Sequence, residues 1–293
     1  AFAASALWQQ WRGVEVESAE RGRQQAGWIL TGGLDWARLI LREDGRAGGP
    51  DHPGEPWAMP LKESRLSTFL SADSQVLEDD RNAFLSGQIV DLQSRMNISN
   101  LILGNTVSLA DLRAFERLYA QLGLPAGELQ SLADQLRLAV TGAAAGESAV
   151  PLRPRNLAQL AWLGLPESSI RKLAPFVTLL PERTPVNINT ASAEVLEAVI
   201  AQLDQAGAQR LVAARAQAPF QQLSDATPLL GTEGVTLNAG AHSIDSHFFE
   251  ARARLRIDQL TVEERSLLQR QGLTVTALSR ERGVVPELAA FLQ

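Results

Sequence analysis

Apolar residues recur about every 3.6 positions from Leu7 to Ile40, and the first proline of the chain is Pro50. This spacing places the apolar side chains on one face of an α-helix. The pattern predicts one long helix over residues 1–44, with an apolar stripe that packs on a partner or on its own domain. A Gly- and Pro-dense connector at 46–60 ends the helix, because neither helix nor strand persists through such a segment.

Alternating apolar and charged residues predict strands in two later parts of the chain. Short strand-like segments lie at 83–85 and 87–93, and the alternation is clearest at 246–257. A further strand is predicted at 273–278. The segment 261–270 fits either a helix or a strand.

Between these strand groups the sequence is typical of paired helices, beginning at Ser108, whose hydroxyl can cap a helix start. The string Leu-Gly-Leu-Pro occurs at 122–125 and again at 163–166, each time between two apolar helices. Glycine can adopt the left-handed conformation that stops a helix, and proline suits the first turn of the next helix. The string therefore predicts a repeated helical hairpin, and a third pair is expected at 193–203 and 206–216.

The order of these elements predicts an α+β fold. A long N-terminal helix packs on an antiparallel sheet, and a large all-α domain is inserted between strands, because each flanking strand group is too short to form a stable sheet alone. The predicted bounds are 1–96 and 236–293 for the α+β domain and 97–235 for the inserted α-helical domain.

Composition narrows the classes of function. The chain has 293 residues, a net charge of −6 and no cysteine. The absence of cysteine excludes disulfides, thiolate metal sites and cysteine nucleophiles. A negative net charge argues against binding to polyanions, because phosphate contacts need a local excess of Lys and Arg. No nucleic-acid partner is therefore expected.

Several segments together carry a resemblance to a known family. They are the helix pattern 21–36, Pro56-Trp57-Ala58, the stretch 87–101, Val186-Asn187-Ile188-Asn189-Thr190-Ala191 and Ser246-His247-Phe248-Phe249. In this combination, and over nearly the whole chain, the sequence resembles the general secretory pathway protein K family of type II secretion systems.

The resemblance implies a pilin-like fold and a structural role rather than an enzymatic one. It implies a minor pseudopilin at the tip of the type II secretion pseudopilus, which assembles with the I- and J-type minor pseudopilins to initiate or cap the filament for protein export. Further partners that it implies are the major pseudopilin and secreted substrates. The expected location is the periplasm of a Gram-negative bacterium, with anchoring in the inner membrane by a helix segment that would precede Ala1.

Two sets of site residues follow from these expectations. The partner-binding stripe of the long helix is predicted at Leu7, Trp11, Val14, Ile29, Trp36 and Ile40, because aromatic and aliphatic anchors carry much of the binding energy in interfaces. No cofactor is required, but some members of the family bind calcium. Asp79, Asp80, Asn82 and Asp91 could supply the hard oxygen ligands that calcium prefers, although adjacent acidic residues also mark solvated turns.

Two rival functions have some support in the sequence. Asn187 to Ala191 resembles the opening of a helix-hairpin-helix module, so residues 186–216 could bind DNA. The following turn contains Asp204, which would repel a phosphate, and a structural hairpin is favoured. A weaker hypothesis is a hydrolase that uses Ser243 with His242 or His247, near Asp245.

Overall fold

The computed structural model describes residues 2–66, 83–145, 150–231, 235–257 and 260–283. Contacts divide the chain into two compact units. The first unit contains the described residues of Ala1–Ala47, Gly54–Val90 and Phe249–Pro286. The second unit contains the described residues of Gly48–Pro53 and Asp91–Phe248.

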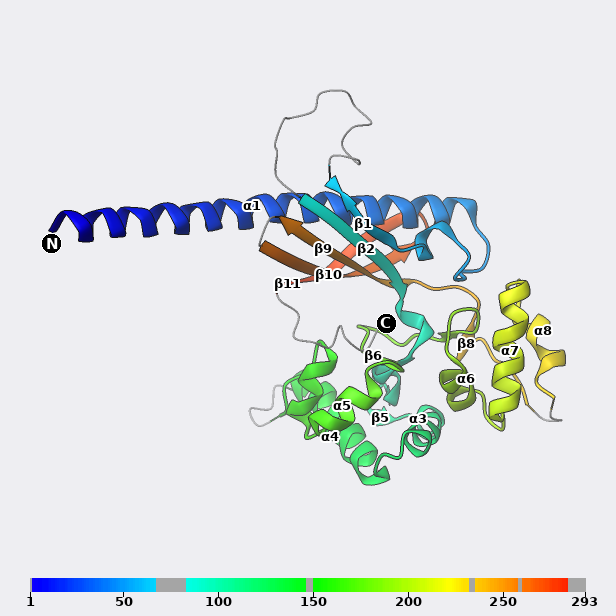
Figure 1. Cartoon of the computed structure of the whole chain (residues 1–293). Coiled ribbons are helices and arrows are strands. Elements are labelled where there is room, and N and C mark those ends of the chain that lie inside the picture. Colours follow the sequence, from blue (N-terminus) through cyan, green and yellow to red (C-terminus); the bar gives the residue numbers. More distant parts are fainter. Residues whose placement is uncertain (1, 67–82, 146–149, 232–234, 258–259, 284–293) are drawn as a thin grey trace. The chain divides into compact units, whose positions relative to one another are not determined.

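The long N-terminal helix α1 (Phe2–Ala47) confirms the helix predicted at 1–44. Its buried residues follow one another at spacings of three or four, which keeps them on one face of the helix. This face packs on the sheet of the first unit, while the N-terminal part of α1 extends beyond the sheet (Figure 1). The buried residues of α1 are Ala26, Leu30, Leu34, Ala37 and Leu41.

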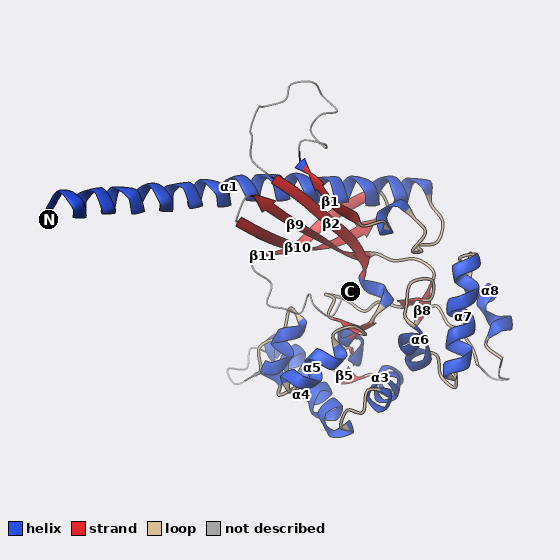
Figure 2. Ribbon diagram, viewed as in Figure 1, coloured by secondary structure: helices blue, strands red, loops and turns tan. Residues whose placement is uncertain are grey.

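A five-stranded sheet with the order β1-β2-β9-β10-β11 forms the other layer of the first unit (Figure 2). β1 pairs with β2, and β10 with β11, in antiparallel fashion. The ambiguous segment 261–270 is a strand, because its backbone pairs along its length with β11. The strands are β1 (Leu61–Arg65), β2 (Ala83–Asp91), β9 (Phe248–Ile257), β10 (Leu260–Gln271) and β11 (Thr274–Gly283), and the 3₁₀ helix η1 (Pro56–Ala58) precedes them.

The C-terminal end of α1 is fixed on the sheet by an ion pair and a close backbone approach. Asp44 pairs with Arg270 of β10, and both side chains are about nine-tenths buried, at 9% and 10% exposed. The Arg270 guanidinium lies 4.9 Å from the ring centre of Phe249. A Cβ atom at Gly45 would lie 2.9 Å from the carbonyl oxygen of Gly272, so only glycine allows this approach.

The second unit is mainly helical and has one large apolar core. Its α-helices are α3 (Leu109–Gln121), α4 (Ala126–Ala145), α5 (Glu167–Leu173), α6 (Ala193–Val199), α7 (Gln205–Gln217) and α8 (Leu223–Ala226). Its 3₁₀ helices are η2 (Leu92–Ser94), η3 (Ile98–Leu101), η4 (Leu157–Leu163) and η5 (Thr227–Leu229).

Short strands complete the second unit. They are β3 (Met96–Asn97), β4 (Ile102–Leu103), β5 (Thr106–Val107), β6 (Val177–Thr178), β7 (Val186–Asn187) and β8 (His242–Ser243). β3 pairs with β6 and β7 with β8, each in parallel, and β4 pairs with β5 in antiparallel fashion.

The two Leu-Gly-Leu-Pro turns form as predicted. Gly123 and Gly164 have φ angles of +61° and +85°, the left-handed conformation that glycine adopts without steric cost. The helix before the first turn is α3, but the helix before the second turn is the 3₁₀ helix η4. The repeat is therefore a repeat of the turn rather than of two identical hairpins.

The helical unit has wider bounds than the predicted insertion at 97–235. It begins at Asp91 and continues to Phe248, and it also takes in Gly48–Pro53. Polar contacts explain the difference, because Ser246 donates a hydrogen bond from its amide to Asp51 and one from its hydroxyl to Asp91. No described helix combines the length and the apolarity needed to cross a membrane.

Candidate functional site

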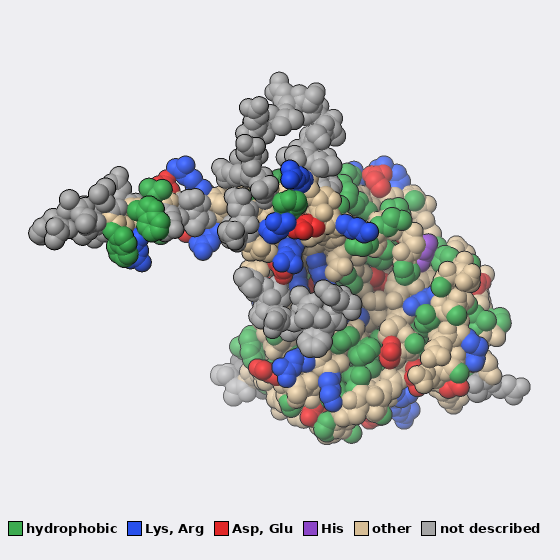
Figure 3. Space-filling model, viewed as in Figure 1, with side chains coloured by type: hydrophobic (Ala, Val, Ile, Leu, Met, Phe, Trp, Pro, Cys, Tyr) green, Lys and Arg blue, Asp and Glu red, His purple; other side chains and the backbone are tan. Residues whose placement is uncertain are grey.

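The side of α1 that faces away from the sheet carries large exposed apolar side chains. At 100° per residue, five of them fall within an arc of about 100°, which we call the outer stripe. Figure 3 shows hydrophobic side chains beside charged ones on the part of α1 that extends beyond the sheet. The outer stripe consists of Trp11, Val14, Trp28, Trp36 and Leu39, which are 59%, 61%, 77%, 50% and 43% exposed.

The sheet covers the predicted partner-binding residues of α1 to different extents. Trp11, Val14 and Trp36 belong to the outer stripe. Ile29 and Ile40 are half-buried and pack against the sheet-facing clusters, so they offer a partner less surface. Leu7 lies in α1, but its side chain is outside the described residues. Contact of these residues with a partner stays a prediction.

Trp28 and Leu39 were missed by the sequence reasoning. A signal was present, because Trp11, Val14, Trp28 and Leu39 are separated by 3, 14 and 11 residues. These separations match a seven-residue repeat with alternating steps of three and four. At 100° per residue the six predicted residues lie within an arc of about 80°, which overlaps the outer stripe and adjoins the face that packs on the sheet.

Most described charged side chains on the exposed surface of α1 pair with one another, whereas Arg12 lies over the ring of Trp8. Each pair joins residues of the same helix, and the side chains are largely solvent-exposed, so each contributes at most about 0.5 kcal/mol to stability. A partner that approaches α1 therefore meets locally balanced charge beside an apolar stripe. The pairs are Arg21 with Glu17, Arg23 with Glu20, Arg38 with Asp35, and Arg42 and Arg46 with Glu43.

A cleft of about 60 Å³ opens between α1 and the sheet of the first unit. Gly33, Trp36 and Ile40 line it from α1, and Met59 lines it from the segment before β1. The carboxylate of Glu264 also lines the cleft. The cleft thus shares Trp36 with the outer stripe.

Glu264 is buried and already has a cationic partner. One carboxylate oxygen accepts hydrogen bonds from two nitrogens of Arg282, at 2.9 and 2.7 Å. The other oxygen lies 3.5 Å from the hydroxyl of Ser266. The carboxylate is therefore neutralised within the first unit and does not present an unpaired negative charge to the cleft.

Asp91 is the centre of a buried polar network in the second unit. One carboxylate oxygen accepts a hydrogen bond from the amide of Gln93 at 2.7 Å. The other accepts from the hydroxyls of Ser246 and Thr190 and from the amide of Asn187. Burial raises the pKa of Asp91, and the hydrogen bonds from Thr190, Ser246, Gln93 and Asn187 oppose this effect.

Asn187 connects the same network to the connector after α1. Its side-chain amide donates to the carbonyl oxygen of Asp51 and to the hydroxyl of Ser246, each at 3.0 Å. The amide of Ser246 in turn donates to the carboxylate of Asp51 at 2.7 Å. Segments far apart in the sequence are thus joined where the chain enters and leaves the second unit.

Asn189 and Thr190 do not cap α6, the helix that follows their motif. Ser192 caps α6 by accepting a hydrogen bond from the amide of Val195 at 3.4 Å. The side chain of Asn189 instead bonds both the amide and the carbonyl of Phe220. Residues 187–190 therefore join parts of the second unit that are far apart in the sequence.

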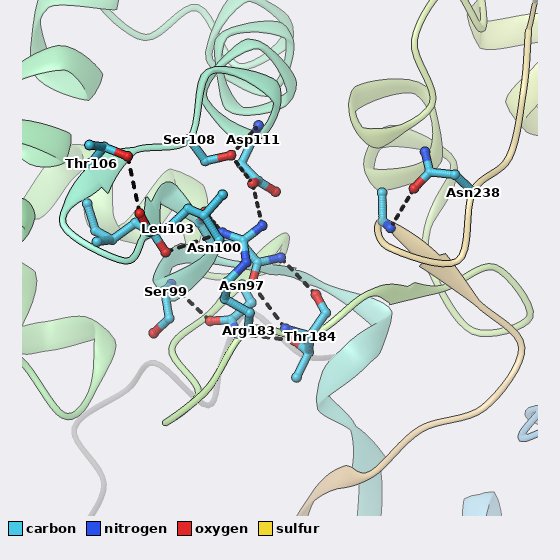
Figure 4. Close-up of polar contacts among 12 residues, drawn as sticks. Asn97, Ser99, Asn100, Leu103, Thr106, Ser108, Asp111, Arg183, Thr184 and Asn238 are labelled. Carbon is cyan, nitrogen blue, oxygen red and sulfur yellow. Dashed lines mark hydrogen bonds and ion pairs between the residues drawn. The ribbon is translucent and has the colours of Figure 1, made fainter.

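Asn97 and Asn100, which belong to the stretch 87–101, also join segments that are far apart in the sequence. Figure 4 shows that Asn97 and Asn100 point toward the segment around Arg183 and Thr184. Asn100 exchanges two hydrogen bonds with the backbone of Thr184, at 2.8 and 3.0 Å. Arg183 pairs with Asp111 at 2.7 Å. These contacts give the motif a structural role within the second unit.

The calcium ligands predicted from the sequence can be placed only in part. Asp79, Asp80 and Asn82 lie outside the described residues. Both oxygens of Asp91 accept hydrogen bonds, so a calcium ion would have to displace those donors. Asp91 therefore does not fit a calcium ligand in this arrangement, and calcium binding by the chain stays a prediction.

The hydrolase hypothesis requires a hydrogen bond between the Ser243 hydroxyl and a histidine, and the described residues do not form one. The Ser243 hydroxyl donates to the carbonyl of Asp245 and accepts from its amide, rather than bonding a histidine. His242 is buried, and its Nδ1 lies 3.1 Å from both the amide nitrogen and the carbonyl oxygen of Asn238. In the part of the chain that the structure describes, the Ser243 hydroxyl is therefore not hydrogen-bonded to a histidine that could activate it.

Burial lowers the pKa of His242, so stability should depend on pH. In the unfolded state the imidazole of His242 binds a proton near its ordinary pKa of 6.5, whereas in the folded state it does so only at lower pH. The stabilisation is therefore present above pH 6.5 and is lost as pH falls toward the folded pKa. We expect the unfolding free energy to fall by up to about 1.4 kcal/mol per pH unit there. His242→Gln should reduce this slope when unfolding by urea is measured at a series of pH values.

The turn of the helix-hairpin-helix-like segment ends in a negatively charged cap. Asp204 is the N-cap of α7, and its carboxylate accepts a hydrogen bond from the amide of Gly207 at 2.7 Å. The amide of Gly207 is thus bonded to a carboxylate of the same turn. This occupies a position at which a DNA-binding hairpin would contact phosphate.

Comparisons with known proteins agree on one family. Two family models, each described as type II secretion system protein K, match residues 94–182 and 186–245. The type II secretion system protein K of Pseudomonas aeruginosa is 30% identical over 280 residues, which cover 88% of this chain and 77% of that protein.

The fold is similar to that of a chain in the crystal structure of the GspK-GspI-GspJ complex from the type 2 secretion system of enterotoxigenic Escherichia coli. The TM-score is 0.69, the sequence identity is 19%, and the match covers 91% of this chain and 99% of the other. None of these comparisons supports the DNA-binding alternative.

Proposed function

Because the chain belongs to the type II secretion system protein K family, we propose that it is a minor pseudopilin that assembles with the I- and J-type minor pseudopilins at the tip of the pseudopilus. The observation that carries this proposal is the outer stripe of α1, an exposed apolar surface on a helix that also extends beyond its sheet. The structurally similar chain comes from a complex that contains GspI and GspJ.

The arrangement of the first unit supports a pilin-like interpretation of the fold. A long helix packs by one face on a five-stranded sheet, and its N-terminal part lies beyond that sheet. We take the second unit as a domain inserted between β2 and β9, because its residues 91–248 lie between these strands in the sequence. A helical unit of this size would fit a terminal position in a filament better than a buried one.

The family context also suggests where and how the chain acts. We propose a periplasmic location, with the full-length protein anchored in the inner membrane before assembly. Its contribution would be to begin or cap the filament rather than to catalyse a reaction. The major pseudopilin and secreted substrates are further proposed partners.

Placing charges in the outer stripe should abolish assembly. We expect Trp28→Glu with Trp36→Glu to weaken binding to the I- and J-type pair by at least about 100-fold, since each aromatic anchor contributes about 2 kcal/mol or more. Both side chains are at least half exposed, so the chain should still fold. Co-purification and calorimetric titration with the two pseudopilins would measure the effect.

Trp162→Glu is the matched control for this experiment. Trp162 is 55% exposed, comparable to Trp36, but it belongs to η4 in the second unit. We expect this variant to bind the I- and J-type pair like the wild type. If the double variant at Trp28 and Trp36 also binds like the wild type, α1 does not use the outer stripe for assembly.

Calcium binding can be tested separately from assembly. If Asp79, Asp80 and Asn82 ligate calcium, then calcium at 100 times its Kd should stabilise the fold by about 2.7 kcal/mol relative to a chelator. Asp79→Asn with Asp80→Asn should remove this shift in Tm, and Asp134→Asn in α4 should preserve it. Equal Tm values with calcium and with chelator would contradict calcium binding by the chain.

A further inference from the structure

The apolar layer between α1 and the sheet is incomplete at one place. The buried residues form two separate clusters, one around Leu34 and Trp57 and the other around Leu30 and Leu85. The cleft of about 60 Å³ is lined by residues of both clusters. Protein interiors are normally packed without such gaps, so a gap that opens to the surface is a candidate binding site.

The chemistry of the cleft favours an uncharged occupant. Its lining is mainly apolar, and the carboxylate of Glu264 is already paired with Arg282. A lysine or arginine side chain would lose its hydration without gaining an unpaired anion. The volume is about four times the 15 Å³ that one water molecule needs, which suits one apolar side chain of medium size.

The position of the cleft connects it with the outer stripe. Trp36 belongs to both, and Gly33 and Ile40 line the cleft from the adjoining flank of α1. Met59, which is 67% exposed, lines it from the side of β1. A helix that packs along the outer stripe would therefore have side chains within reach of the cleft. Such a helix would meet mostly paired charge, because five arginines of α1 pair with acidic residues of the same helix.

We propose that the cleft receives one apolar side chain from the N-terminal helix of a partner minor pseudopilin, and so fixes the register of that helix along α1. This inference rests on the proposed function and deepens it. The outer stripe supplies apolar side chains at several places along α1, while the cleft accepts a side chain at only one position along the partner helix. Helix packing by ridges and grooves alone would allow neighbouring registers.

Gly33 allows the cleft to be filled from within the chain. A Cβ atom built at Gly33 has no neighbouring atom within 4 Å. Gly33→Ala should increase helix propensity and leave most of the cleft empty, so partner affinity should stay within about twofold of the wild type. Gly33→Phe should occupy the cleft, raise Tm and weaken partner binding at least about tenfold.

The outcomes separate this inference from the proposed function. If the wild type binds neither the I- nor the J-type pseudopilin, the proposed function fails. If the wild type binds, Trp28→Glu abolishes binding, and folded Gly33→Phe binds like the wild type, then the outer stripe is an interface but the cleft has no role in it.

A cross-linking experiment tests the same inference without altering the cleft volume. The chain contains no cysteine, so Met59→Cys provides a single attachment point for a thiol-reactive photo-cross-linker beside the cleft. We expect cross-links to one short segment of the N-terminal helix of a partner pseudopilin. Cross-links only to a second copy of this chain, or to no part of a partner helix, would overturn the proposal.

Discussion

Replacing Asp91 with alanine is expected to lower the free energy of unfolding of the second unit by about 3–5 kcal/mol. The carboxylate accepts hydrogen bonds from Gln93, Ser246, Thr190 and Asn187 in a buried position. Alanine would remove this shared acceptor, although Asn187 keeps its hydrogen bonds to Asp51 and Ser246, and a buried group left unsatisfied costs about 1–3 kcal/mol. Urea unfolding followed by far-UV circular dichroism would measure the change.

Two further variants show whether hydrogen bonding causes this loss. Asp91→Asn keeps the shape of the side chain but places an NH₂ donor where an acceptor is needed, so most of the loss should remain. Asp134→Ala in α4 removes an exposed carboxylate and should change stability by less than about 0.5 kcal/mol. Wild-type stability of Asp91→Asn would show that shape, and not the acceptors, matters at this position.

Arg270→Ala should destabilise the first unit by about 3–5 kcal/mol. This change leaves Asp44 without its cationic partner although its side chain is only 9% exposed. It also removes the guanidinium that lies over the ring of Phe249. The measurement is the unfolding free energy in urea followed by near-UV circular dichroism, to which the edge-on packing of Trp57 against Phe249, at 5.2 Å between ring centres, contributes.

The double variant Asp44→Leu with Arg270→Met should recover more than half of this loss. A buried ion pair replaced by apolar side chains of similar size is often neutral for stability, since neither charge must then be desolvated. A loss below about 1 kcal/mol for Arg270→Ala alone would contradict the role given to the pair.

Local patterns in the sequence predicted most of the secondary structure. The period of α1, the alternation in β9 and the Gly-Pro turns depend on neighbouring residues and can be interpreted without the tertiary structure. The segment 261–270 could not be decided in this way. It forms a strand because its backbone pairs with β11, whose residues come later in the chain.

The sequence predicted the helix that carries the candidate interface, and the contact of its residues with a partner stays a prediction. α1 has apolar side chains on both the buried face and the outer stripe, and periodicity alone does not tell which of them the sheet covers. Ile29 and Ile40 are packed against the sheet-facing clusters, whereas Trp28 is 77% exposed. The cleft beside Gly33 depends on how two layers fit together and has no local signal in the sequence.

The sequence by itself determined the long helix, the strands with clear alternation, the helical unit between them and the family, because each rests on local patterns or on residues in order along the chain. Only the tertiary structure decided which face of α1 remains exposed and that Asp91, Asn187 and Ser246 meet in one buried network. Asn187 lies 96 residues from Asp91 and 59 from Ser246. Contacts over such separations form through packing of the whole unit, which no local pattern contains.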